Sequence, residues 1–431
     1  MRPRRRDRAF DGKVRVPMSA SEPLLICDLT QSYSPHGGGG VGIYLAEKRR
    51  YVLDHTPHRL LQIVPGPEDR IAVEGRHIWC EIGAEPVNGS PNYRFIMRKK
   101  KVREVLARYR PDIIESMCPW VLPWVAIRHR RVFPDSALVA GYHTDFPDAQ
   151  VYRVASDLMG APLGRFFRFL SRCYGEITYR EFDKVYTVGQ STLANLTRMK
   201  AAAEVLPLGV DTGVFHPDKA DRAAFRREIG LDPTGPLLVY AGRIDNEKAA
   251  GVLIEMAHLL PRELDAALVM IGDGKLVQEL KARAAGLPVA FLGFIGEREK
   301  LARAMASSDI YVSAMPSETF GVSVIEAQAC GLPVIGVAGG EMPARVAPGT
   351  GLLGPVGDAA AMAANVVALW GGDRRAAGEA ARALVEADYS WRLTFDRLFG
   401  EIYPEALARA RARVERGPVW MPVTRLLRGT A

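Results

Sequence analysis

Two glutamates, Glu318 and Glu326, stand eight residues apart in the sequence, with Gly321 between them. The segment from Val322 to Cys330 has the pattern of a helix, because turn formers stop it and a short apolar strand pattern follows. The start of such a helix offers free backbone N–H groups and a positive dipole end, which suit a phosphate. Acceptor-only side chains on both sides of that anion site indicate a ligand with a diphosphate flanked by hydroxyls. A nucleotide sugar has this chemistry.

Glutamates at such places are most often solvated surface charges, so this interpretation depends on other residues. Gly242 follows the first strand predicted in the second half of the chain, and it lets backbone approach a ligand. Arg243 and Lys248 then place two cations at the same edge, where they would offset charge on a departing diphosphate. A Gly-Asp-Gly turn, residues 272–274, follows the next strand, and Phe294 follows the third, where backbone could hold a nucleobase edge.

A histidine in the first half of the chain is a further candidate. His143 and Asp145 directly follow an apolar strand pattern, at the edge where parallel sheets bind ligands. A lone histidine is more often structural. A histidine close to an acid at a strand end is a better candidate for chemistry, so both residues are assigned to the site.

The elements that must position these residues are short apolar runs that alternate with helical segments. This alternation predicts parallel sheets with right-handed crossovers, and ligands bind such sheets at the carboxyl ends of the strands. The fold class is therefore α/β, with two doubly wound Rossmann-like domains facing across a cleft. The predicted strands are residues 24–28, 60–64, 112–115, 138–142 and 184–188, then 237–241, 267–271, 289–292, 310–313 and 334–337.

Length and composition agree with this organisation. A chain of 431 residues with 48% hydrophobic residues fits two soluble domains. The turn-rich segment 207–217 reads as the linker between them. The predicted parts are a basic arm over 1–21, an N-terminal acceptor-binding domain over 22–208, a C-terminal donor-binding domain over 209–388, and final helices with a tail over 389–431. We expect these helices to pack back toward the N-terminal domain.

The distribution of charge indicates the partners. Residues 1–16 hold seven Arg or Lys and two Asp, which leaves only +3 of the formal net charge of +8 for the rest. This balance argues against a nucleic-acid partner and points to local basic patches. Residues 94–110 form a basic amphipathic segment, residues 128–131 a second basic group, and the tail from Trp420 to Arg428 mixes apolar and basic residues. Such segments can lie on an anionic membrane surface, or they can be solvated helix faces over a core.

Targeting signals and cysteines suggest a location. No apolar run reaches the roughly 18 residues of a membrane span, and the basic N-terminus lacks the apolar region of a secretory signal. The five cysteines show no paired spacing, so free buried thiols in a reducing cytoplasm are expected. We expect a cytoplasmic protein, peripheral on the inner face of the cytoplasmic membrane.

In their order along the chain, these motifs are highly specific. They are Gly-Arg-Ile-Asp-Asn-Glu-Lys at 242–248, Gly-Asp-Gly at 272–274, Phe-Leu-Gly at 291–293 and Ser-Glu-Thr-Phe-Gly at 317–321, followed by the second glutamate. The sequence resembles the family 4 retaining glycosyltransferases of the GT-B fold. The resemblance runs over nearly the whole chain, from the glycine loop at 37–40 to the helix that contains Glu326. One departure is that Ala249 and Ala250 follow Lys248, which leaves the lysine intact but leaves the start of the next helix open.

The resemblance implies a role for each matching position. Arg243 and Lys248 would bind the donor diphosphate, Glu326 the ribose hydroxyls and Glu318 the sugar hydroxyls. His143 would lie near the reacting sugar, in a stretch similar to that of bacterial lipid-directed members that use GDP-mannose or UDP-sugars. The backbone amides of Phe320, Gly321 and Val322 would bind the phosphate and the sugar, and the loop with Gly39 and Gly40 would close over the donor. Asp145 would orient His143 or contact the acceptor. His36 would be a second-choice contact with the acceptor.

The same resemblance implies the reaction. The family is thought to react on one face of the sugar, with the departing phosphate helping to take the acceptor's proton, so the protein positions groups and stabilises charge. No Asp-x-Asp motif of the metal-dependent kind is present, so no metal or other cofactor is expected. The predicted function is transfer of a hexose from GDP-mannose, UDP-glucose or UDP-glucuronic acid to a lipid or lipid-linked glycan.

Three other functions fit parts of this sequence pattern. The glycines at 37, 39 and 42 satisfy a dinucleotide-binding motif, but the preceding strand ends about eight residues too early and the next one ends without an acid, which argues against a nicotinamide dehydrogenase. A nucleotide-sugar 2-epimerase shares the two-domain fold and stays open. A non-catalytic nucleotide-sugar-binding protein also stays open, although the intact charged residues weigh against it.

Overall fold

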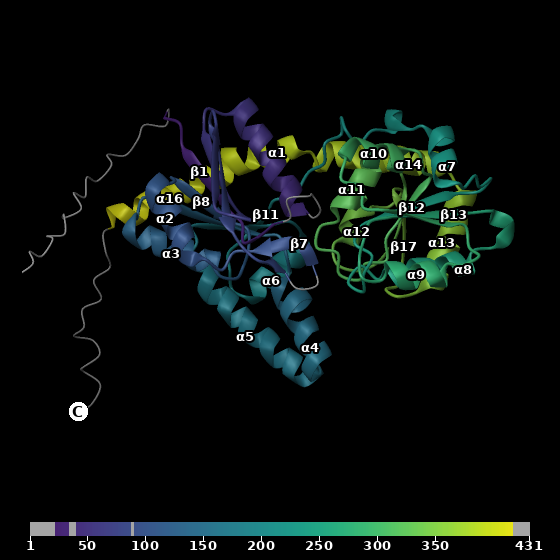
Figure 1. The fold of residues 1–431 in the computed structure, drawn as a ribbon, viewed down its shortest axis with the longest axis horizontal. Coiled ribbons are helices and arrows are strands. Elements are labelled where there is room, and N and C mark those ends of the chain that lie inside the picture. Colours follow the sequence, from purple (N-terminus) through teal and green to yellow (C-terminus); the bar gives the residue numbers. More distant parts are fainter. Residues whose placement is uncertain (1–21, 34–39, 88–89, 417–431) are drawn as a thin grey trace, which may run out of the picture.

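The computed structural model describes residues 22–33, 40–87 and 90–416, except the side chains of residues 90–93. Two large sheets form the two halves of the molecule, and helices cover both of them (Figure 1). Side chains on both faces of the central strands are buried. Along β12 (Leu237–Ala241), for example, Val239 lies in one apolar cluster and Leu238 in another. Such continuous apolar strands are typical of parallel sheets covered by helices on both faces.

The C-terminal sheet has six parallel strands in the order β14-β13-β12-β15-β16-β17. This is the order of a doubly wound sheet. Successive strands are added on one side of β12 up to β14, and on its other side from β15 onward, so the strand order reverses between β12 and β15. The crevice at that reversal is where such sheets bind ligands. The strands are β12 (Leu237–Ala241), β13 (Ala267–Ile271), β14 (Val289–Gly293), β15 (Ile310–Val312), β16 (Val334–Val337) and β17 (Gly351–Gly354).

The N-terminal sheet has eight strands in the order β11-β10-β9-β8-β1-β3-β5-β4, and only the β4–β5 pair is antiparallel. A small antiparallel sheet in the order β2-β7-β6 accompanies it. The strands are β1 (Leu25–Leu29), β2 (Ser32–Tyr33), β3 (Arg59–Gly66), β4 (Arg70–Glu74), β5 (His77–Gly83), β6 (Pro86–Val87), β7 (Ser90–Phe95), β8 (Ile113–Ser116), β9 (Ala137–Tyr142), β10 (Lys184–Thr187) and β11 (Glu204–Val205).

Helices connect the strands of both sheets. In the first half these are α1 (Gly40–His55), α2 (Lys99–Tyr109), α3 (Leu122–Val132), η1 (Phe146–Tyr152), α4 (Arg153–Met159), α5 (Ala161–Tyr179) and α6 (Gln190–Arg198). In the second half they are η2 (Pro217–Lys219), α7 (Arg222–Ile229), α8 (Ala250–Leu259), η3 (Arg262–Leu264), α9 (Val277–Arg283), α10 (Arg298–Ala306), α11 (Val322–Ala329), α12 (Met342–Arg345), α13 (Ala359–Gly371) and α14 (Arg374–Asp388).

The last helices run from the C-terminal half back to the N-terminal half (Figure 1). They are α15 (Trp391–Arg397), η4 (Leu398–Ile402) and α16 (Tyr403–Glu415). Glu405 pairs with Lys184 of β10 at 2.7 Å, and the Arg409 side chain donates to the carbonyl of Asp183 at 2.7 Å. One buried apolar cluster, which includes Trp391 and Phe395, continues from one half to the other. The final helices therefore tie the two halves together.

The structure confirms the α/β prediction and each of the ten predicted strands to within two residues. The sequence missed β4 and β5 at the edge of the first sheet, β17 at the edge of the second, and the short strands β2, β6, β7 and β11. The basic segment 94–110 is only partly helical. Phe95 lies in β7, and α2 begins at Lys99, so Phe95 is not on the apolar face of that helix as expected.

Two further observations concern the environment of the protein. Among the helices of the described ranges, none combines the length and the apolar character that crossing a bilayer requires. All five cysteines are free, as predicted, but Cys118 and Cys173 are half-buried, whereas Cys27, Cys80 and Cys330 are buried.

Candidate functional site

The loop after β12 presents Arg243 and Lys248 from a tightly bonded turn. The Tyr240 hydroxyl donates to the carbonyl of Arg243 at 2.7 Å. The Asp245 carboxylate accepts from the backbone N–H of Lys248 at 2.9 Å and also pairs with the Arg243 guanidinium. Arg243 pairs in addition with Glu247 at 2.9 Å. The two cations are therefore held on one loop by the acids between them.

The glycines around this loop allow two loops to pack together. A Cβ on Gly272 would lie 1.9 Å from the carbonyl oxygen of Gly242, and Ile244 donates its N–H to the carbonyl of Asp273 at 2.9 Å. A Cβ on Gly242 would lie 2.7 Å from the Tyr240 hydroxyl oxygen. The Gly-Asp-Gly turn thus supports the loop that carries Arg243. The role of Gly242 in meeting a donor stays a prediction.

Ala249, which follows Lys248, has an unusual backbone. Its φ is +50°, in the left-handed region that only glycine and a few polar residues enter readily, and α8 begins at Ala250. The helix start that the sequence left open is therefore set by one strained alanine beside the lysine.

Lys248 and Glu318 meet, although they come from different loops. The Lys248 Nζ lies 3.2 Å from Oε2 of Glu318 and 2.8 Å from the sulfur of Met315. The Glu318 side chain is nearly buried, at 9% exposed. A Cβ on Gly340 would lie 2.2 Å from the carbonyl oxygen of Glu318. This glycine, which sequence reasoning did not select, lets a neighbouring loop press against the glutamate.

The helix α11 begins where the sequence placed it. Gly321 has φ +88° and ψ 54°, a left-handed conformation that a side chain would strain, and α11 starts at Val322. The first backbone N–H groups of any helix have no partner inside it, so they are available to an anion beside Phe320 and Gly321. A Cβ on Gly40, the first residue of α1, would lie 3.4 Å from Val322. The N-termini of α1 and α11 therefore face each other across the two halves.

Glu326 lies one turn inside α11, with a partner that the sequence did not reveal. Arg298 Nη1 lies 2.9 Å from Oε1 of Glu326, which is 4% exposed, and the guanidinium lies 4.6 Å from the centre of the Phe215 ring. Burial raises the pKa of Glu326, and the Arg298 charge opposes that rise.

Phe294, five residues after β14 begins, is 54% exposed, so its ring is available at this edge.

His143 stands at the end of β9 and contacts aromatic side chains. Its Nε2 lies 3.2 Å from the Tyr186 hydroxyl, and its ring meets that of Tyr44 edge to face, with the ring centres 5.2 Å apart. The Nδ1 atom is buried and has no hydrogen-bond partner in the described part of the protein. Burial lowers the pKa of His143 to about 4, with Glu115 raising it and Lys48 lowering it further. The imidazole is therefore neutral at pH 7.

The hydrogen bonds of the Tyr186 hydroxyl determine the tautomer of His143. Tyr186 donates its single hydroxyl hydrogen to Oε1 of Glu115 at 2.8 Å, because a carboxylate can only accept. The Tyr186 oxygen must then accept from His143, so Nε2 carries the hydrogen. Nδ1 is left with a lone pair, which suits it to accept a hydrogen bond from a hydroxyl.

Beneath His143 lies a fully buried charged network. Glu115 accepts from Tyr44 at 2.8 Å and from Tyr403 at 2.5 Å, and it pairs with Lys48 at 3.1 Å. Lys48 also pairs with Asp28. Burial acts to raise the pKa of Glu115, but Lys48 and then the tyrosine hydroxyls outweigh burial and lower it. Glu115 is therefore the ionised centre of the network that supports Tyr186 and His143.

Asp145 does not hold His143. Its Oδ1 accepts from the Tyr142 hydroxyl at 3.1 Å, and its Oδ2 accepts from the Asn195 amide at 2.7 Å. Burial raises the pKa of this carboxyl. Tyr186 is the hydrogen-bond partner of His143 in place of Asp145. Contact of Asp145 with an acceptor stays a prediction. His36 and Gly39 lie outside the described residues.

Contacts between the two halves border the site. Arg153 of α4 pairs with Glu247 at 3.0 Å, so one acid joins Arg153 to Arg243. Burial alone would raise the pKa of Glu247, but Arg243 and then Arg153 outweigh it and lower the pKa. The Glu341 carboxylate accepts from the backbone N–H of Ser191 at the start of α6. Lys248 and Glu318 are brought together directly in the C-terminal half, whereas His143 lies in the N-terminal half.

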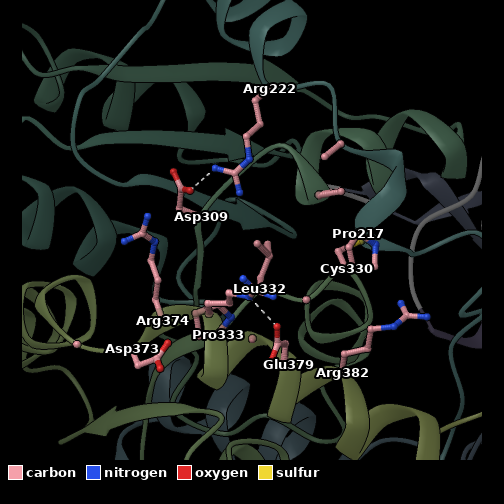
Figure 2. Close-up of a pocket in the computed structure, with 16 residues that line it drawn as sticks. Pro217, Arg222, Asp309, Cys330, Leu332, Pro333, Asp373, Arg374, Glu379 and Arg382 are labelled. Atoms are coloured by element: carbon pink, nitrogen blue, oxygen red, sulfur yellow. Dashed lines mark hydrogen bonds and ion pairs between the residues drawn. The ribbon is translucent and has the colours of Figure 1, made fainter.

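A cavity of about 660 Å³ lies at the other edge of the C-terminal sheet (Figure 2). Asp309 and Pro333, which line it, precede β15 and β16, so this cavity is at the amino ends of the strands. Its arginines have local partners, since Arg222 pairs with Asp309 at 2.5 Å and Arg382 pairs with Glu386 at 2.7 Å. This cavity is therefore separate from the candidate site. Within the described residues, no group of three or more His, Cys, Asp or Glu is placed to hold a metal ion.

Comparison with known sequences and structures gives consistent matches over both halves. The family described as Glycosyltransferase Family 4 matches residues 38–214, and the family described as Glycosyl transferases group 1 matches residues 235–371. A GDP-mannose-dependent alpha-(1-6)-phosphatidylinositol dimannoside mannosyltransferase from Mycobacterium tuberculosis is 31% identical over 294 residues, which cover 64% of this chain and 70% of that protein. The sulfoquinovosyl transferase SQD2 from Arabidopsis thaliana is 29% identical over 311 residues, which cover 70% of this chain and 58% of that protein.

Among solved structures, the sucrose-phosphate synthase from Thermosynechococcus elongatus superposes with a TM-score of 0.72. The match covers 90% of this chain and 100% of that chain at 22% sequence identity. At this identity the likeness shows a shared fold.

Proposed function

The chain belongs to the family 4 glycosyltransferases of the GT-B fold, and from this premise we propose that it transfers a hexose, with retention of configuration, from a nucleotide sugar to a lipid or lipid-linked glycan. The observation that carries the proposal is the 3.2 Å pair of Lys248 and Glu318 beside the start of α11, at the point where the strand order reverses. A cation for the diphosphate and an acceptor for sugar hydroxyls stand together there with free helix amides.

Each residue has a role in this proposal. Lys248 and Arg243 bind the diphosphate and stabilise the charge that develops on it as the glycosidic bond breaks. Glu326 accepts from the ribose hydroxyls and Glu318 from those of the sugar. His143, neutral and with a lone pair on Nδ1, accepts from a hydroxyl of the bound sugar and fixes its position. The departing phosphate takes the proton of the acceptor hydroxyl, and no metal ion is required.

The choice of donor and acceptor follows the relatives. The Mycobacterium tuberculosis relative is named as GDP-mannose-dependent and as acting on a phosphatidylinositol dimannoside, so GDP-mannose and a glycolipid acceptor are the first pair to test. The proposed location is the inner face of the cytoplasmic membrane, where nucleotide sugars and lipid acceptors meet.

A donor panel tests the proposal. The purified protein is heated with GDP-mannose, UDP-glucose or UDP-glucuronic acid, with and without EDTA, and one of them should stabilise it by about 2.7 kcal/mol at a hundred times Kd. That donor is then incubated with membrane lipid extract, and the anomeric configuration of the product is read by NMR. Stabilisation by none of the sugar nucleotides would overturn the proposal. Conversion of the donor to its 2-epimer without acceptor would indicate an epimerase, and binding without turnover a non-catalytic protein.

A further inference from the structure

The helices α4 and α5 form a hairpin that projects from the N-terminal half of the molecule (Figure 1). The chain turns between them at Gly160, whose φ is +83°. The two helices pack closely, because a Cβ on Gly164 would lie 2.0 Å from the Ser156 hydroxyl oxygen. The hairpin is therefore a defined element, and its far end lies away from both sheets.

The hairpin exposes large apolar side chains to water. Leu158 is 77% exposed and Phe169 is 61% exposed. On α5 the exposed apolar residues recur at helical spacing, so they form one stripe. Gly164, Gly175 and Thr178, which are buried, lie on the other side of that helix. The exposed set is Val154, Leu158, Met159, Leu163, Phe166, Phe167, Phe169, Leu170 and Ile177.

A stripe of this size turned away from the core indicates a partner, because isolated exposed apolar residues are normal but a contiguous group is not. The charge of the hairpin indicates which partner. Residues 146–180 contain five arginines and three acids. Arg165 is exposed and forms no ion pair among the described residues, whereas Arg168 and Arg172 both pair with Asp148, at 3.0 and 2.9 Å. A second copy of the same hairpin would bring like charges together, but an anionic lipid surface would complement them.

We propose that the α4–α5 hairpin is the element by which this protein docks on an anionic lipid surface, with its phenylalanines and leucines entering the headgroup region. The inference rests on the proposed function, and it names a surface other than the basic segments at 94–110 and 128–131. Arg130 of the latter is engaged with Glu181 at 2.7 Å and is only 12% exposed.

The position of the hairpin explains its use. The π-helix η1 begins at Phe146, three residues after His143, and leads directly into α4. Arg153, the first residue of α4, pairs with Glu247, which also pairs with Arg243. A hairpin resting on lipid would thus hold both walls of the candidate site near the surface from which a lipid acceptor comes.

Flotation with vesicles tests the proposal in the full-length protein. Vesicles of equal parts phosphatidylcholine and phosphatidylglycerol are compared with phosphatidylcholine alone. The double variant Phe166→Ser/Phe169→Ser should lower binding to the anionic vesicles by about tenfold or more. The matched control is Val73→Ser/Leu259→Ser, which also removes exposed apolar side chains but lies outside the hairpin, and it should bind like the wild type.

Three results would overturn the proposal. The first is that the wild-type protein does not float with anionic vesicles. The second is that the hairpin variant floats like the wild type. The third is that the wild type is a dimer and the hairpin variant a monomer, while flotation is unchanged. The last would mean that the stripe binds a second copy. Transfer to a detergent-dispersed acceptor separates this inference from the proposed function, since the hairpin variant should retain that activity even where it no longer binds vesicles.

Discussion

The Nζ of Lys248 lies 3.2 Å from Oε2 of Glu318, although 70 residues separate them in the chain. Lys248 follows β12 and Glu318 follows β15, and these strands are neighbours in the sheet. The strand order reverses between them, so the topology itself brings a cation and an acceptor together at the crevice. The pair is thus a product of the sheet order, and its chemistry can be tested by removing either charge.

Lys248→Ala should lower kcat/KM by about 100- to 1000-fold, because the departing diphosphate loses a preorganised cation. Steady-state kinetics with a saturating acceptor measures this. Lys300→Ala is the control, since Lys300 pairs with Glu297 at 2.8 Å on the surface and should leave kcat/KM unchanged. A Lys248→Ala protein that stays within threefold of the wild type would remove Lys248 from the site.

Glu326→Gln should weaken donor binding and stabilise the fold at neutral pH. Burial raises the pKa of Glu326, so the folded protein binds the proton more tightly than the unfolded chain, and stability from this group falls as pH rises through the raised pKa. Glutamine removes the free-energy cost of burying a charged carboxylate. It also removes a charged acceptor for the ribose hydroxyls, which we expect to raise Kd for the donor about tenfold or more.

Thermal unfolding at a series of pH values and donor titration calorimetry measure both effects of the Glu326 change. The gain in unfolding temperature should be present at pH 7 and disappear in acid, where the wild-type carboxyl is protonated. Equal donor affinity in the two proteins would contradict the assignment of Glu326 to the ribose.

His143 should not contribute a titration near its ordinary pKa to the pH profile of the reaction. Burial lowers its pKa to about 4, so the imidazole is neutral from pH 5 upward and gains a proton only below that range. A plot of kcat/KM against pH should therefore show no histidine limb between pH 5.5 and 8. A limb in that range that disappears in His143→Gln would contradict this expectation.

Tyr186→Phe provides a sharper test of the same arrangement. The hydroxyl of Tyr186 fixes the hydrogen on Nε2 of His143, and its loss should let the other tautomer form. Nitrogen NMR of labelled histidine should show the Nε2–H form in the wild type and a mixture in the variant, with a fall in kcat/KM of about tenfold. An unchanged tautomer would show that Tyr186 does not position His143.

The sequence predicts the carboxyl ends of the central strands well and the supporting contacts poorly. Short apolar runs locate the strands, so residues just after them, such as Lys248 and Glu318, fall at the ligand-binding edge without further information. Arg298 and Glu115 could not be found in this way, because their partners are distant in the chain. Tyr403, for example, lies 288 residues from Glu115.

The hairpin shows a second limit of sequence reasoning. The spacing of Phe166 and Leu170 tells which residues share a face of a helix, but the same pattern describes a stripe that faces a core and one that faces water. The glycines show a third limit. The sequence predicts a tight turn at Gly272, but it does not reveal that the structure uses this glycine for close approach of one loop to another.

Tyr403→Phe should lower the free energy of unfolding by about 1.5–3 kcal/mol, since it removes a hydrogen bond to the buried, charged Glu115. Tyr51→Phe is the matched control. The Tyr51 hydroxyl donates to Asp396 at 2.6 Å at an exposed site, where water replaces the lost bond, and the expected change is within about 0.5 kcal/mol. Calorimetric unfolding at neutral pH measures both, and equal effects would contradict a special role for the buried network.

Ala249→Asn should stabilise the protein by about 1 kcal/mol. Alanine at φ +50° carries the strain of a left-handed conformation, which asparagine tolerates better, and asparagine is also favoured at the residue before a helix. Ala380→Asn is the control, because residue 380 is exposed inside α14, where asparagine is a poorer helix former than alanine. The unfolding temperature should therefore rise for the first variant and fall for the second. A fall for both would mean that the backbone at Ala249 is not under strain.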